Sequence, residues 1–190
     1  MSRWSRLALL TICFFSVPSS WANLDTWRID YDNSKVSFFA EQAGAEFEGY
    51  WRNWDAEVRF DPEHLEASAA RAEFNIDSVH TGDSERDETL RDAEWFDGNA
   101  HPLATFEATE FSALQDGSFE ADSILTVKGL AAPVSFRFQL QQKAKRIVLN
   151  GEATIDRLAA GLGLGEWADT SWIGQFVRVK VEMHAHVGER

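Results

Sequence analysis

The stretch Val134-Ser135-Phe136-Arg137-Phe138-Gln139-Leu140-Gln141 alternates apolar and polar side chains without a break. Successive side chains of an extended chain point to opposite faces, so its apolar residues share one face and its polar residues share the other. Antiparallel sheets that keep one face in water have this pattern, whereas strands of parallel sheets are apolar on both faces. The stretch therefore predicts an antiparallel β-sheet wrapped over an apolar interior.

The same alternation recurs along the chain, and turn signals such as Asp61-Pro62 and Gln115-Asp116-Gly117 separate the runs. About eight strands with few helices favour closure into a barrel, because closure removes exposed edges. We expect an all-β fold, an antiparallel barrel of about eight strands with one or two short helices; a sandwich of two sheets is the structural alternative. The alternating runs lie at residues 35–40, 55–60, 70–77, 119–127, 134–141, 147–155 and 177–186.

Helix signals are sparse and concentrate in residues 82–95, where acidic side chains crowd the first turn and favour a helix start. Thr81 or Asp83 is the expected N-cap. This helix is polar nearly all round, so we expect it on the outside of the barrel or across one end. A short turn is expected at residues 62–67.

The first 22 residues have the three-part layout of a secretory signal peptide. Arg3 and Arg6 precede an apolar run of about a dozen residues, shorter than the ~20 that a membrane span requires. Ser20-Trp21-Ala22 places small residues where a signal peptidase cuts. We therefore expect a signal peptide at residues 1–22, one domain at residues 23–190, and a periplasmic protein.

Composition excludes several functions for the segment after residue 22. Its only cysteine, Cys13, leaves with the signal peptide, so disulfides, thiolate nucleophiles and cysteine metal sites are not expected. Without Arg3 and Arg6, 16 of the 18 basic residues remain against 31 acids, a formal charge of −15. Such a surface repels nucleic acid and anionic membranes, so a nucleic-acid partner is not expected.

Catalytic and metal signals are weak. His184 and His186 share a strand face, as two metal ligands would, but that face is the polar one. No Gly-x-Ser-x-Gly elbow supports a serine hydrolase. The acids of residues 83–92 lack the spacing of a calcium loop and suit a helix start instead. Neither catalytic residues nor a metal are predicted.

The run Gly161-Leu162-Gly163-Leu164-Gly165 lacks the lysine and helix of a phosphate-binding loop. An irregular loop beside a barrel mouth is the favoured interpretation. An apolar lip formed there by its two leucines and Trp167 is a second one.

The interior decides the function. The inward faces mix phenylalanines with small residues, and an eight-stranded barrel either fills itself with side chains or holds one ligand. The sequence pattern alone leaves the filled and the hollow barrel equally open. The small inward positions are Ala40, Gly49, Ala70, Ala72, Ala121, Gly151 and Ala153.

A family resemblance favours the hollow barrel. The chain resembles the YceI-like family over residues 26–187, most specifically at Ser78-Val79-His80-Thr81-Gly82, Arg86-Asp87 and Trp95-Phe96-Asp97. Leu125-Thr126-Val127-Lys128-Gly129 and Ile155-Asp156-Arg157 continue the match. The resemblance implies a lipocalin-like barrel that binds a polyisoprenoid lipid, often in secreted proteins linked to stress responses.

The chain departs from the family at Asn33, Gln42-Ala43-Gly44, Lys128 and Ala131, where the family often has histidines or a threonine. The departures weaken any polar or metal role tied to those histidines and leave the apolar faces untouched. They do not alter the inference of a lipid pocket.

The leading hypothesis is a non-catalytic carrier of an isoprenoid quinone or polyprenyl amphiphile, with no cofactor besides that bound lipid. An alternative is an accessory quinone-handling subunit for a cytochrome b561-like membrane protein. Residues 163–172 suggest it, because they are similar to the branch of the family that is found beside, or fused to, cytochrome b561-type membrane proteins. A lipid hydrolase is less favoured, and a homodimer stays open. The expected ligand-binding residues are Phe38, Phe74, Phe106, Phe119, Phe136 and Phe138.

Overall fold

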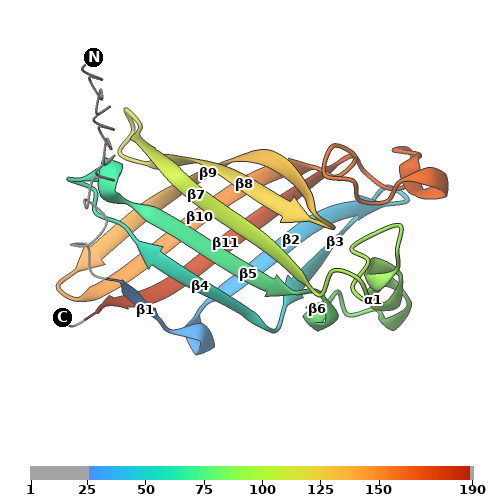
Figure 1. Cartoon of the computed structure of the whole chain (residues 1–190), viewed down its shortest axis with the longest axis horizontal. Helices are drawn as coiled ribbons and strands as arrows, with labels where there is room; N and C mark the ends of the chain where they lie inside the picture. Colours follow the sequence, from blue (N-terminus) through green and yellow to red (C-terminus); the bar gives the residue numbers. More distant parts are fainter. Residues whose placement is uncertain (1–25, 189–190) are drawn as a thin grey trace, which may run out of the picture.

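The computed structural model describes residues 26–188, so the expected signal peptide lies outside the described residues. One antiparallel sheet curls into an elongated barrel, and a short α-helix lies at one end (Figure 1). None of the described helices is long and apolar enough to span a membrane. The elements are β1 (Trp27–Ile29), β2 (Lys35–Gln42), β3 (Ala45–Trp51), β4 (Trp54–Arg59), β5 (Ala69–Asn75), β6 (Val79–His80), α1 (Ser84–Arg91), β7 (Leu103–Ala113), β8 (Phe119–Val127), β9 (Leu130–Lys143), β10 (Arg146–Asp156) and β11 (Phe176–Val187).

The strands follow the order β4-β5-β7-β8-β9-β10-β11-β2-β3-β6, and β1 pairs with the end of β11. The antiparallel barrel predicted from the alternation is confirmed, but the described residues form eleven strands rather than about eight. Sequence patterns missed β1 and β6 because they are very short. They missed β3 because Gly49 interrupts its apolar face, and β7 because its register shifts between Ala108 and Glu110.

The sheet does not close by backbone pairing at every strand. Within residues 26–188, no ladder joins β4 to β1, β2 or β3, and β3 runs into β4 through Arg52 and Asn53. Side chains bridge this seam: the Tyr31 hydroxyl donates to Asp55 and accepts from the Ala56 amide at 3.3 Å. These contacts satisfy part of the open edge of β4, which would otherwise be free to pair with another chain.

Helix α1 is shorter than the expected span of residues 82–95, and it lies across one barrel end as predicted (Figure 1). The Asp83 carboxylate caps it by accepting from the Glu85 and Arg86 amides at 3.0 and 3.1 Å. Beyond Arg91 the chain turns so that Trp95 and Phe96 enter the barrel, where both are buried. Burial of these two rings therefore overrides the continuation of the helix.

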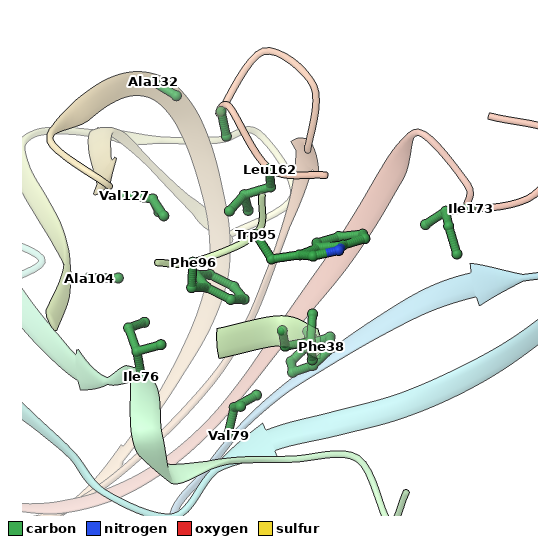
Figure 2. Close-up of a cluster of buried hydrophobic side chains, with 12 residues drawn as sticks. Phe38, Ile76, Val79, Trp95, Phe96, Ala104, Val127, Ala132, Leu162 and Ile173 are labelled. Atoms are coloured by element: carbon green, nitrogen blue, oxygen red, sulfur yellow. The ribbon is translucent and has the colours of Figure 1, made fainter. Parts of the chain in front are cut away.

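Two apolar clusters occupy the two ends of the barrel. The cluster at the α1 end combines strand residues such as Phe38 with Trp95 and Phe96 and with Leu162 of the loop at residues 157–175 (Figure 2). At the opposite end, Trp27, Phe60 and Ile147 belong to the second cluster. The far end is therefore packed with large side chains.

Arg157 organises the loop at residues 157–175, which lies beside α1 at the same end (Figure 1). Its guanidinium is buried, with 1% of the residue exposed, and it contacts the Trp95 ring. All five of its N–H groups donate to main-chain oxygens at 2.7 to 3.1 Å. The acceptors are the carbonyls of Leu162, Gly163, Trp167, Ile173 and Gly174. Burial of an unpaired charge is unfavourable, and this complete set of bonds offsets it.

Substituting Arg157→Lys should lower the free energy of unfolding by about 2–5 kcal/mol. Lysine has only three donors, so at least two buried carbonyls lose their partner. Chemical denaturation measures the change. The matched control is Arg178→Lys on the outer face of β11, where the partly exposed ion pair with Glu46 is worth about 1 kcal/mol or less. Equal losses in the two variants would contradict the organising role of Arg157.

Candidate ligand-binding cavity

A cavity of about 430 Å³ lies inside the barrel and is lined mainly by apolar side chains from most of the strands. Pockets that hold small-molecule ligands generally measure roughly 300–1,000 Å³. The two apolar clusters contribute residues to its two ends, which makes it elongated. The barrel is therefore hollow, an outcome that the sequence pattern left open.

Five of the six phenylalanines predicted to bind ligand line this cavity: Phe38, Phe74, Phe106, Phe136 and Phe138. Their role in binding stays a prediction. The sixth, Phe119, is not in the lining. It packs with ring centroids 5.1 Å from Phe60 and 5.5 Å from Phe138, so it supports the wall from the closed end.

Small residues keep the interior open. Ala40, Ala70, Ala72, Ala121 and Ala153, all predicted as small inward positions, line the cavity. The other two have a different role: a Cβ at Gly49 would overlap the Phe38 ring, and one at Gly151 would overlap Phe136. These glycines let the two rings lie flat against the neighbouring strand instead of filling the barrel.

The structure adds small lining residues that the sequence reading did not single out. Ala56, Ala104 and Ala108 belong to this group. Ala56 belongs to the alternating run at residues 55–60, whereas Ala104 and Ala108 lie on β7, whose alternation is interrupted by the register shift after Ala108.

Polar lining residues gather at the α1 end, which identifies the mouth. Gln42 ends β2, and Asp83, Glu85, Arg86 and Thr89 belong to α1 or cap it. Toward the other end, the lining is apolar apart from Arg71 of β5, and the cluster around Trp27 closes the barrel. A long ligand would therefore place its apolar chain toward the closed end and its polar end near α1.

Arg86 ties α1 to the strands across the mouth. Its Nε donates to the Gln42 side chain at 3.1 Å, and its guanidinium lies 3.9 Å from the centre of the Phe47 ring. The adjacent Asp87 turns away to bind other groups, so the pair Arg86-Asp87 does not form an ion pair between its own members. Arg86 therefore joins α1 to β2 and β3, and a ligand that enters here would have to pass this side chain or displace it.

Asp87 fixes the turn that leads into α1. Its carboxylate accepts hydrogen bonds from the Thr81 amide and hydroxyl, both at 2.7 Å, and lies 3.0 Å from His80 Nδ1. Burial raises the pKa of this carboxyl, but the bonds from Thr81 and His80 outweigh burial and hold the pKa below its usual value. His80 therefore serves a local hydrogen bond within this turn.

Two cavity-lining indoles hold unused hydrogen-bond donors. Within residues 26–188, neither Trp51 Nε1 nor Trp95 Nε1 has a partner, and both atoms are buried. Buried N–H groups normally find an acceptor, and an unsatisfied one costs about 1–3 kcal/mol. A ligand oxygen that reached either indole after a small side-chain movement would remove that cost.

The remaining chemical candidates lie outside the cavity. His186 is exposed, and His184 lies 3.5 Å from Glu182. The described part of the chain contains no group of three or more metal-ligating side chains. In the glycine-rich loop Leu162 lines the cavity together with Trp167, whereas Leu164 is exposed, so only part of the expected apolar lip faces inward.

Comparisons with known proteins agree with this architecture. The model of the YceI-like domain matches residues 27–185. A UPF0312 protein of Ectopseudomonas mendocina is 33% identical over 86 residues, 45% of each chain. One from Vibrio cholerae is 27% identical over 122 residues, 63% of this chain and 64% of its own. The chain spans about half the length of the first of these curated relatives.

Solved structures share the fold. Burkholderia cenocepacia BcnA has 29% identity and a TM-score of 0.78, over 83% of this chain and 99% of its own. A polyisoprenoid-binding domain from Saccharophagus degradans has 15% identity and a TM-score of 0.67, over 87% and 100% of the two chains. At 15% identity, the second likeness concerns the fold alone.

Substituting Asp87→Asn should lower the free energy of unfolding by roughly 1–2 kcal/mol at neutral pH, because neutral hydrogen bonds replace charge-assisted ones. The pKa of the Asp87 carboxyl is lower in the folded protein than in the unfolded chain, where it is about 3.9. The charged carboxylate therefore stabilises the fold at pH values above about 3.9, and this stabilisation is lost as the pH falls through the folded-state pKa. The difference between the two proteins should therefore shrink below about pH 4. Urea titrations at several pH values measure it, and a difference independent of pH would contradict the charged role of Asp87.

Proposed function

The chain belongs to the YceI-like domain family, and on that premise we propose that it binds one long-chain isoprenoid lipid, such as an isoprenoid quinone or polyprenyl amphiphile, without catalysis. The observation that carries the proposal is the elongated apolar cavity with polar groups at one end. A lipid with a long branched tail and a small polar head has the same distribution of polarity. The structural neighbour from Saccharophagus degradans, described as a polyisoprenoid-binding domain, supports the ligand class.

The energetics favour a long tail over a small apolar molecule. Burying several hundred Å² of apolar surface at about 25 cal/mol/Å² contributes on the order of 10 kcal/mol. Association itself costs roughly 4–15 kcal/mol. Only a ligand that occupies most of the cavity length therefore binds usefully, which selects chains of several isoprene units.

The polar end of the ligand is proposed to lie near α1. Gln42 and Thr89 supply neutral polar groups there, and Trp95, which lines the cavity at the same end, supplies an unused donor. A carbonyl or hydroxyl oxygen matches these donors. This arrangement supports a quinone or prenyl alcohol head.

The expected signal peptide makes the periplasm the proposed site of action, where such a protein would carry a lipid that is insoluble in water. Relatedness to the YceI-like family supports a binding protein rather than an enzyme. A cytochrome b561-like partner and a homodimer stay predictions from the sequence.

The first test is organic extraction of protein purified from the cells that naturally make it, followed by mass spectrometry. A polyprenyl lipid in stoichiometric amount is the expected result. Protein that is free of lipid and also fails to take up added quinone would overturn the proposal.

A matched pair of variants locates the ligand in the cavity. Ala153 is buried and lines the cavity, whereas its neighbour Thr154 is exposed on the outer face of β10. Ala153→Trp should fill the centre of the cavity and reduce binding of a long-chain quinone strongly, while Thr154→Trp should leave it unchanged. Equilibrium titration with the quinone in detergent measures both, and equal affinities in the two variants would sink the assignment.

A further inference from the structure

Exposed apolar side chains are concentrated at the mouth of the cavity. Seven large hydrophobic residues of the described chain are exposed, and all except Tyr31 and Ile124 lie at the α1 end. Four of them line one side of that end, at the start of β9, on the loop at residues 157–175 and at the start of β11. We call these four the apolar rim: Leu130, Leu164, Trp172 and Phe176. Trp172 is 53% exposed and Phe176 is 62% exposed.

The rim is held in place. Arg157 binds the Gly163 carbonyl, directly before Leu164, and the Ile173 carbonyl, directly after Trp172. The Trp172 carbonyl itself accepts from the Ala43 amide at 2.7 Å. A Cβ at Gly161 would overlap Leu130, which places that leucine against the same loop. The exposure of these side chains is thus a feature of a fixed surface joined directly to the mouth.

The chemistry of the rim fits a membrane surface better than a stable protein interface. A protein partner generally covers about 800 Å² of each chain. A whole aromatic side chain contributes about 150–250 Å², so two partly exposed aromatics and two leucines supply too little. Tryptophan, phenylalanine and leucine on projecting loops are the residues that enter the headgroup region of a bilayer.

The charge of the protein specifies the kind of bilayer. Glu166 and Asp169 are exposed beside the rim, and the chain as a whole is strongly acidic. An anionic surface repels such a protein, because membrane attraction of this kind depends on lysine and arginine. A zwitterionic surface leaves apolar contact as the attractive force.

We propose that the mouth of the barrel docks on a zwitterionic lipid bilayer through Leu130, Leu164, Trp172 and Phe176. The ligand tail then passes between bilayer and cavity without exposure to water. Docking on the bilayer is independent of the proposed lipid-binding function, whereas passage of the tail into the cavity rests on that function.

Flotation with phosphatidylcholine vesicles tests the docking. The wild-type chain should float with the vesicles, and the double variant Trp172→Ala/Phe176→Ala should bind roughly tenfold more weakly or worse, since affinity scales with the apolar area inserted. The matched control is Ile124→Ala, which removes an exposed apolar side chain from the barrel wall. Vesicles containing phosphatidylglycerol should bind the wild type more weakly, and added salt should restore that binding.

Several results would overturn docking: a wild type that stays with the soluble fraction, a double variant that floats like the wild type, or tighter binding to anionic vesicles. A double variant that floats normally but no longer copurifies a membrane protein would assign the rim to a protein partner instead. Quinone added in detergent separates the two proposals. The double variant should bind it as the wild type does, whereas failure of the wild type to bind it would count against the lipid-binding function alone.

Discussion

The pairing of β10 with β11 fixes which side chains of the barrel face inward. It runs without a shift from Arg146 opposite His186 to Asp156 opposite Phe176. On its other side β11 pairs with β2, so the same register also fixes the orientation of β2 side chains. Side chains alternate with a period of two, so a slip by one residue would turn Val179 and Val181 outward and their charged neighbours into the cavity. The contrast between an apolar interior and a charged exterior makes such a slip very unfavourable. Every later feature, including the cavity and its mouth, depends on this register.

The hollow interior follows from the sizes of facing residues. Phenylalanines lie opposite alanines or glycines on neighbouring strands, as Phe38 does with Gly49 and Phe106 with Ala72. The glycines at positions 49 and 151 let rings lie along the wall. A sheet with large residues at all inward positions would fill its own interior, as many small barrels do. The empty volume removes dispersion contacts and is unfavourable in the ligand-free protein. A bound apolar chain would restore those contacts, which is why the cavity is better understood as a binding site than as a packing defect.

The two ends of the barrel have different roles because they are built differently. At the closed end, aromatic side chains pack on one another around Phe60. At the mouth, α1 and the loop at residues 157–175 are held by polar groups, Arg86 and Asp87 on one side and Arg157 on the other. Hydrogen bonds to fixed backbone groups hold these segments without filling the space between them. The mouth is thereby ordered, and the exposed aromatic residues beside it extend the apolar path outward.

The sequence by itself determined the fold class, because alternation such as that of residues 134–141 is compatible only with an extended strand that has one wet face. It also determined the inward direction of four cavity-lining phenylalanines, Phe38, Phe74, Phe136 and Phe138, and, through its family resemblance, the proposed ligand class. The tertiary structure decided what depends on contacts between distant residues. It shows that Phe119 packs in the closed end instead of lining the cavity, that β4 leaves a seam, and that Arg157 binds five carbonyls of one loop. Local pattern specifies the face on which a side chain lies, whereas the curvature and closure of the sheet specify what that face encloses.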